Sequence, residues 1–213
     1  MDAKTITKAM EELSKGSKRN FSQSYDLLIS LKELNLKKPE EQVEFFANLP
    51  HTTGKQVKVC ALVGPELADE AKAADTAVKV DEFSKLKKPE IKRLAGNHDY
   101  FLGQANIMPK IAQTFGRVLG PRGKMPNPKG GCIVPPKAAL KPLIERLQKT
   151  IKVSVKKQPN IQARVGTQGM KPDEVVQNIL ALYDQVVHHL PKEHNNVKAV
   201  YLKLTMSKPV KLG

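Results

Sequence analysis

Hydrophobic and polar residues follow two periods along this chain, and both occur within the first fifty residues. Ile6, Met10 and Leu13 recur at helical spacing and the pattern ends near Gly16. From Phe21 to Ile29, every second side chain belongs to one face, which is the period of a strand. Residues 43–49 predict a second strand. The N-terminal part should therefore contribute one helix and two strands.

Strand and helix patterns alternate from Lys55 to Val155. The runs KQVKVCALV, TAVKV and DYFLGQ predict strands, and ELADEAKAA and EIKRLAG predict helices. A helix with Pro109 in its first turn runs to Gly120, and leucines recur at helical spacing from Leu140 to Leu147. Alternating strands and helices are typical of a doubly wound parallel sheet.

The C-terminal part returns to patterns like those of the N-terminal part. NIQARVG predicts a strand, and the stretch after Pro172 predicts a helix with an apolar stripe. In the last strand, Val200, Leu202, Leu204 and Met206 should share one face.

Neither terminal part holds enough strands for a stable sheet of its own. We therefore expect an α/β protein of two domains. Residues 1–54 and 156–213 would form a discontinuous α+β domain with an antiparallel sheet built from both termini, and residues 55–155 would form an inserted Rossmann-like α/β domain. The crossings at residues 50–54 and 156–160 would act as a hinge.

Charge changes this picture by indicating a partner. Lys and Arg number 36 against 21 Asp and Glu, which gives a net charge of +15 and favours nucleic acid as the partner. Residues 100–172 carry fourteen of these cations against one acid, Glu145. No apolar run approaches a membrane span and no secretion signal is present, so we expect a cytosolic protein.

Few residues suggest chemistry beyond binding. Cys60 and Cys132 lack metal-ligand neighbours and read as buried hydrophobes, and no catalytic or dinucleotide-binding motif occurs, so we expect no cofactor. Six Phe, four Tyr and no Trp provide few stacking platforms. This composition favours recognition of RNA shape and backbone over splayed bases.

The stretch GPRGKMPNPKGG predicts a rigid basic loop that presents Arg122, Lys124 and Lys129. The loop is either a secondary RNA contact or a segment that packs on its own domain with solvated lysines. It is not a phosphate-binding P-loop, because Val118 and Met125 stand where that motif needs Gly and Ser or Thr.

Four segments in order resemble one family. They are RNFSQSYDL, LPHTTGKQVKV, GRVLGPRGKMPNPKGG and LTMSKPVKL, and the chain is similar over its whole length to the ribosomal protein L1 family in its archaeal form. The resemblance implies a two-domain protein, monomeric when free of the ribosome, whose discontinuous domain carries most of the rRNA contact. It implies binding to the stalk helices of large-subunit rRNA, help in releasing exit-site tRNA, and repression of its own operon through the mRNA. It implies no catalysis.

The resemblance also implies which residues contact RNA. The family's RNA-facing positions fall on Arg19, Asn20, Phe21, Thr205 and Met206. Charge and position add five weaker candidates, which are Lys18, Arg164, Lys171, Lys203 and Lys208. The alternative for Phe21 and Met206 is ordinary core packing.

Ser207 departs from the family pattern, which usually has Gly after Thr-Met. Gly would permit a positive φ or close approach of the backbone to RNA, and Ser would hinder both unless its hydroxyl made a replacement hydrogen bond. On sequence alone, Ser207→Gly is expected to tighten RNA binding.

Two other functions remain open at this level. The central layer could belong to a nucleotide-using RNA-processing enzyme, although the sequence contains no nucleotide-binding motif. The chain could also be a free regulatory protein that binds only mRNA.

Overall fold

The computed structural model describes residues 2–16, 19–38, 41–156 and 158–212. The chain is a mixed α/β protein with several sheets. Its residue contacts gather in two compact units. Unit 1 comprises Met1–Lys55 and Lys149–Gly213, and unit 2 comprises Gln56–Gln148.

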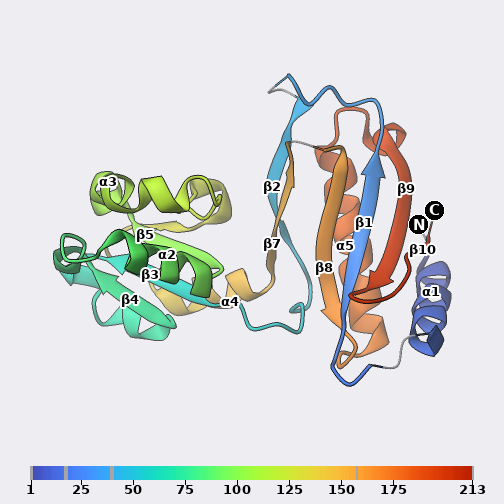
Figure 1. Cartoon of the computed structure of the whole chain (residues 1–213), viewed down its shortest axis with the longest axis horizontal. Coiled ribbons are helices and arrows are strands. Elements are labelled where there is room, and N and C mark those ends of the chain that lie inside the picture. The colour runs from blue at the N-terminus through green and yellow to red at the C-terminus, as the bar shows by residue number, and fades with distance from the viewer. Residues whose placement is uncertain (1, 17–18, 39–40, 157, 213) are drawn as a thin grey trace. The chain divides into compact units, whose positions relative to one another are not determined.

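Unit 1 is built from both ends of the chain. Its main sheet has the order β10-β9-β1-β8, with every neighbouring pair antiparallel (Figure 1). Its elements are α1 (Ala3–Gly16), β1 (Ser24–Leu31), β2 (Val43–Asn48), β7 (Thr150–Val155), β8 (Asn160–Thr167), α5 (Pro172–His189), β9 (Val197–Leu204) and β10 (Val210–Lys211). The N-terminal strand β1 therefore lies between two strands from the C-terminal part.

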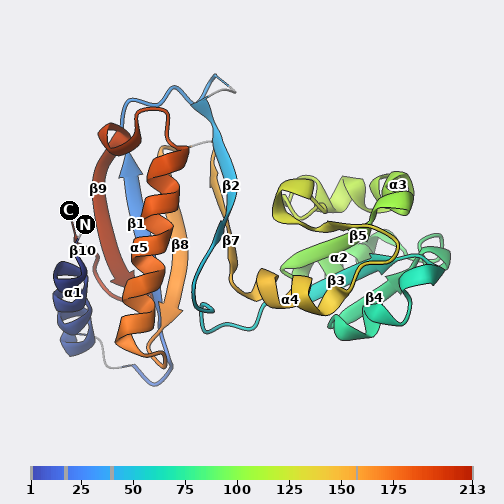
Figure 2. The same cartoon turned by 180° about the vertical axis from the view of Figure 1, so that it is seen from behind.

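Alternation along β1 decides which side of this sheet is covered. Tyr25, Leu27, Ile29 and Leu31 are buried in a core shared with α5, which lies along one face of the sheet (Figure 2). Ser24, Asp26, Leu28 and Ser30 are half-buried and point the other way. We call that second side of the sheet the open face.

Strands β2 and β7 form a separate antiparallel ribbon in unit 1. The Glu44 carboxylate of β2 forms ion pairs with Lys152 Nζ, at 3.0 Å, and Lys156 Nζ, at 2.7 Å. Hydrogen bonds from Lys156 and Lys152 hold the pKa of the Glu44 carboxyl below its ordinary value.

The ribbon corrects the predicted point of return from the central block. The sequence pattern places residues 150–155 in that block and the crossing at residues 156–160, whereas the chain returns to unit 1 between Gln148 and Lys149. The apolar run of β7 shows strand character without showing its partner, and that partner is β2.

Unit 2 holds a four-stranded parallel sheet of order β4-β3-β5-β6. Its strands are β3 (Val59–Val63), β4 (Thr76–Lys79), β5 (Tyr100–Gln104) and β6 (Ile133–Val134), and its α-helices are α2 (Lys88–Asn97), α3 (Met108–Leu119) and α4 (Leu140–Gln148). Every residue of β3 is buried. Cys60 and Leu62 enter a core with residues of α2 and α3, whereas the alternate residues of β3 enter a core with residues of α4. Both faces of the sheet are therefore covered.

One predicted helix of unit 2 is wrong. The run ELADEAKAA forms two 3₁₀ turns, Pro65–Leu67 and Glu70–Ala73, and Ala74 is already extended. Asp75 accepts a hydrogen bond from the Val59 N–H at 2.8 Å. Because this bond holds Asp75 next to the start of β3, the segment before it cannot continue as a longer helix. Unit 2 also has 3₁₀ turns at Val80–Glu82, Ala105–Ile107 and Pro128–Gly130, and unit 1 has one at Glu193–Asn196.

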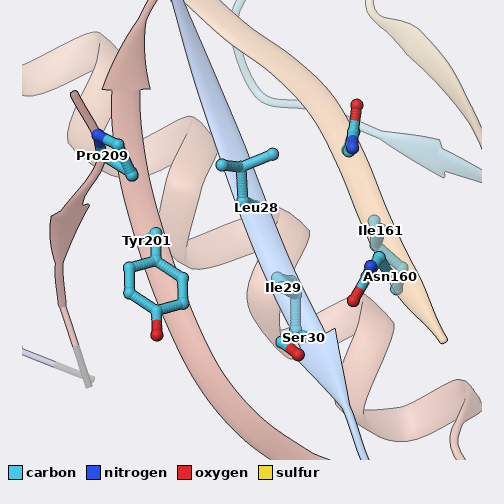
Figure 3. Close-up of a pocket in the computed structure, with 8 residues that line it drawn as sticks. Leu28, Ile29, Ser30, Asn160, Ile161, Tyr201 and Pro209 are labelled. Carbon is cyan, nitrogen blue, oxygen red and sulfur yellow. The ribbon is translucent and has the colours of Figure 1, made fainter. Parts of the chain in front are cut away.

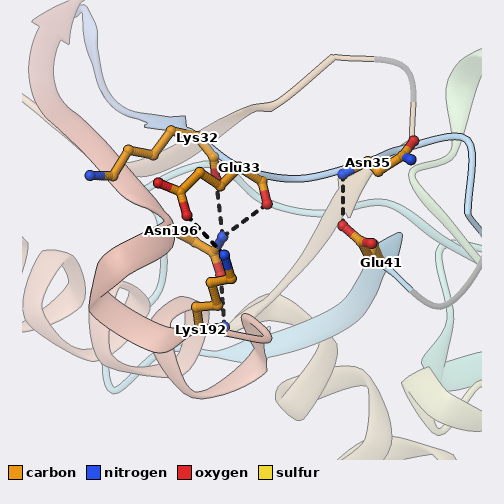
Figure 4. Close-up of polar contacts among 6 residues, drawn as sticks. All are labelled: Lys32, Glu33, Asn35, Glu41, Lys192 and Asn196. Atoms are coloured by element: carbon orange, nitrogen blue, oxygen red, sulfur yellow. Dashed lines mark hydrogen bonds and ion pairs between the residues drawn. The ribbon is translucent and has the colours of Figure 1, made fainter.

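Asn196 forms hydrogen bonds that link the segment after β1 to the segment before β9, at one end of the sheet in unit 1 (Figure 4). Its side chain is fully buried, its Oδ1 accepts the Lys192 N–H at 2.7 Å, and its Nδ2 donates to the Lys32 carbonyl at 3.0 Å. The Lys32 N–H donates to the Asn196 carbonyl at 2.8 Å. The segment after β1 is thereby held against the segment before β9.

We expect Asn196→Ala to lower the free energy of unfolding by about 2 kcal/mol, because it leaves the Lys192 N–H and the Lys32 carbonyl without their buried partner. Chemical denaturation of the two proteins measures the difference. Asn195→Ala is the matched control, since Asn195 is exposed and should cost little. Equal losses in both variants would contradict this role for Asn196.

Candidate nucleic-acid interface

Three strand ends meet in unit 1, where β1 begins and where β8 and β9 finish (Figure 1). Gln23, which is fully buried, connects them. Its N–H donates to Gln168 Oε1 at 3.0 Å, and its carbonyl accepts the Gln168 N–H at 2.9 Å. Its Oε1 accepts the Met206 N–H at 3.0 Å. Gln23 thus fixes the segment after β8 and the segment after β9 against the start of β1.

Thr205 completes the pairing of β9 with β1 at this end. The Thr205 N–H donates to the Ser24 carbonyl at 3.2 Å, and Thr205 Oγ1 accepts the Ser24 N–H at 3.2 Å. Strand β9 ends at Leu204, so Thr205 and Met206 lie in a turn. The prediction that Met206 shares the buried face of Val200, Leu202 and Leu204 is therefore wrong, because the alternation ends with the strand at Leu204.

Ser207 closes the same turn. Its Oγ accepts the Leu204 N–H at 2.8 Å and lies 3.3 Å from the Leu204 carbonyl, to which it can donate. Among non-glycine residues that the structure describes, positive φ occurs at Glu33 and Glu193, and not at Ser207. Ser207 therefore has an ordinary φ and its hydroxyl makes a hydrogen bond within the turn. The effect of Ser207→Gly on RNA binding stays a prediction.

Exposed apolar side chains mark this end of unit 1. Phe21 is 52% exposed and Met206 is 59% exposed, and within the described ranges they are the large hydrophobic residues left in solvent. Core packing is therefore not their role. A surface hollow of about 570 Å³ brings Arg19 together with Met206, Ser207 and Lys208, beside the last turn of α1.

We call this region the strand-end surface. It consists of Arg19, Asn20, Phe21, Thr205, Met206, Ser207 and Lys208. Lys18 lies outside the described residues. Lys171, which is exposed, precedes α5 after the turn that follows β8.

Arg164 and Lys203 lie apart from the strand-end surface, on the open face. Both are in register with Asp26, which sits between them on β1. Burial raises the pKa of the Asp26 carboxyl above its ordinary value, and the charges of Arg164 and Lys203 oppose that rise. No motif or charge cluster points to Asp26 or Gln23, and their partners are distant along the chain.

The basic loop of unit 2 is partly structural. Lys124 Nζ donates to the carbonyls of Ala95, at 2.9 Å, and His98, at 2.7 Å, at the end of α2. Arg122 donates to the Lys92 carbonyl at 3.3 Å. The prediction that Lys124 is presented to a partner is therefore wrong, because the C-terminal carbonyls of a helix attract a cation. Lys129 is exposed.

The described part of the chain contains no group of three or more His, Cys, Asp or Glu residues arranged to hold a metal ion. None of its helices has the length and apolarity needed to cross a membrane. A rigid turn that displays apolar and basic side chains is typical of a binding protein with a polyanionic partner.

Comparison with known proteins identifies the family. Residues 13–208 match the Ribosomal protein L1p/L10e family. The chain is 39% identical to the large ribosomal subunit protein uL1 of Methanothermococcus thermolithotrophicus, covering 100% of this chain and 99% of that protein. It is 36% identical to uL1 of Methanocaldococcus jannaschii, over 100% and 96% of the two chains, and 33% identical to uL1 of Pyrococcus horikoshii, over 99% and 96%.

The chain belongs to the ribosomal protein L1 family, in its archaeal form. It is a structural ribosomal protein and not an enzyme. The alternative of a nucleotide-using RNA-processing enzyme is therefore rejected.

We expect Ser207→Ala to lower the free energy of unfolding by about 1 kcal/mol, because the partly buried Leu204 N–H loses its acceptor. Ser207→Gly should lower it further by adding backbone freedom to the unfolded chain. Thermal or urea unfolding gives both values, and Ser22→Ala, at an exposed serine, is the control. A Ser207→Gly protein as stable as the parent would refute the role given to this hydroxyl.

Proposed function

We propose that this protein is a structural rRNA-binding component of the large ribosomal subunit in the cytoplasm, and that its strand-end surface holds the stalk helices of the rRNA. The proposal is supported above all by one observation. Two large apolar side chains, Phe21 and Met206, stand in solvent on the segments that lead into β1 and out of β9, and these segments are joined by the bonds of Gln23 to Met206 and of Ser24 to Thr205. Exposure of this kind on a fixed backbone favours a partner that covers it.

The surrounding groups suit the backbone and ribose of structured RNA. Arg19 and Lys208 are exposed beside the apolar pair and can contact phosphates. Thr205 Oγ1 accepts one hydrogen bond from Ser24, and a hydroxyl oxygen has a second lone pair for a ribose hydroxyl. Phe21 and Met206 would exclude water around these contacts. Lys171, Arg164 and Lys203 would extend the basic contact beyond the strand-end surface.

The two compact units are proposed to be two domains. Unit 1 is then the discontinuous rRNA-binding domain, and unit 2, with its parallel sheet covered on both faces, is an inserted Rossmann-like domain. We further propose that the protein is monomeric when free of the ribosome. Lys129 remains a candidate for a secondary RNA contact of unit 2.

The same surface would serve two other partners of the family. The protein is proposed to help release tRNA from the exit site, and to repress its own operon by binding an mRNA structure that resembles the stalk. Because one rigid surface cannot hold both RNAs together, free rRNA would compete with the mRNA. Synthesis of the protein would then follow the demand for ribosomes.

Binding to an isolated stalk RNA at one fixed salt concentration tests this function. We expect Thr205→Ala to weaken binding about tenfold, because the ribose contact is lost and the turn loosens. Thr205→Ser keeps the hydroxyl and should bind within about threefold of the parent.

Circular dichroism spectra of the three proteins should coincide, which separates a local change from unfolding. Equal affinities of the parent and Thr205→Ala would show that the strand-end surface is not the RNA site.

A further inference from the structure

A second hollow, of about 270 Å³, lies on the open face of unit 1, away from the strand-end surface (Figure 3). Its walls come from three strands and from the segment that leads into β10. The residues that matter for its chemistry are Leu28, Ser30, Asn160, Gln162, Tyr201 and Pro209. Leu28 and Tyr201 stand side by side on β1 and β9 and point away from the helix behind the sheet (Figure 3).

The strand register connects this hollow to the strand-end surface. Leu28 is in register with Gln162 on one side and Tyr201 on the other. The next row on the same face is Asp26 with Arg164 and Lys203, and the row after that ends near Thr205. Since Tyr201 lies four residues before Thr205, the two sites are about 13 Å apart along β9. One RNA strand can span them.

The lining has the chemistry of a nucleobase site. Tyr201 offers a half-exposed flat ring beside the apolar side chain of Leu28. Its hydroxyl has no hydrogen-bond partner among the described residues, and Asn160 and Gln162 are exposed amides that both donate and accept. A ring for stacking with amides at its margin is how proteins take up an unstacked base in RNA.

The surrounding charge favours an anionic ligand. Lys203 and Arg164 occupy the neighbouring row, and Lys211 of β10 is in register with Tyr201 itself. Asp26 is the single acid in these rows of the open face. This complementarity fits the phosphates on either side of a bound nucleotide better than it fits an apolar peptide.

We propose that this hollow binds one unstacked base of the RNA that the strand-end surface holds, with Tyr201 as the stacking residue. The inference rests on the proposed function and adds a base-specific contact to it. The chain has only ten aromatic residues, and Tyr201 is the one that lines this hollow.

Binding of Tyr201→Leu and Tyr201→Phe to stalk RNA tests the proposal. Loss of the ring should weaken binding about tenfold, whereas Tyr201→Phe keeps the ring and should bind within about threefold of the parent. A panel of stalk RNAs, each with one abasic unpaired position, identifies the base. At one position, the abasic RNA should bind the parent about tenfold more weakly and bind Tyr201→Leu no more weakly than intact RNA does.

Gln162→Ala provides a second variant that cannot act through the core, because Gln162 is exposed. It should weaken intact RNA binding about threefold and leave the abasic RNA of that position unaffected. If Tyr201→Leu and Gln162→Ala both bind like the parent while Thr205→Ala is weakened, the base site is refuted and the proposed function stands. If every abasic RNA weakens parent and Tyr201→Leu equally, the base site is also refuted. Failure of the parent to bind any stalk RNA would instead refute the proposed function.

Discussion

Strand β1 can form its hydrogen bonds only if the C-terminal part of the chain folds on both of its sides. It pairs with β8 on one edge and β9 on the other, and Gln23 at its start is bonded to Gln168, 145 positions later. Among the described residues of the N-terminal part, the other strand is β2, and it pairs with β7 instead. Residues 56–148 must therefore leave this sheet and return to it, which is why they form a compact unit of their own.

The same constraint positions the candidate RNA site. Because β1 begins where β8 and β9 finish, residues from three distant segments converge without a long loop. The polar side chains at this end bond to neighbouring backbone groups, as Gln23, Thr205 and Ser207 do. The large apolar side chains of Phe21 and Met206 stand in solvent beside them. A preformed surface loses little conformational entropy when it binds, so a few contacts can be selective. The proposed role of the excess positive charge elsewhere is to attract RNA, although part of it, as at Lys124, is bonded within the protein.

Much of this fold could be predicted from local patterns. The helix at Ile6, Met10 and Leu13, the alternation around Leu27 and the buried run at Val59–Val63 all have the periods that the structure shows. The pairing of strands is harder to predict than the strands themselves. The sequence pattern places β7 in the central block, because an apolar run predicts a strand without indicating which strand it pairs with. The helix predicted after Gly64 was wrong because Asp75, outside the helical pattern, is bonded to the start of β3.

The candidate site shows the same limit. Arg19, Phe21 and Thr205 could be selected from a family resemblance, whereas Gln23 and Asp26 owe their positions to contacts across more than one hundred residues. The hydroxyl of Ser207 accepts the Leu204 N–H, which is a contact that the residue type alone could not predict.

We propose that the strand-end surface provides the selectivity for RNA and that the basic residues provide electrostatic attraction. The dependence of stalk-RNA affinity on salt separates these two terms, because each phosphate contact adds about 0.7 to 0.9 to the slope of log affinity against log salt. Met206→Ala should give a line parallel to that of the parent but displaced to weaker binding, whereas Arg164→Ala should flatten the slope by nearly one contact. A Met206→Ala line that coincides with the parent line would contradict the claim.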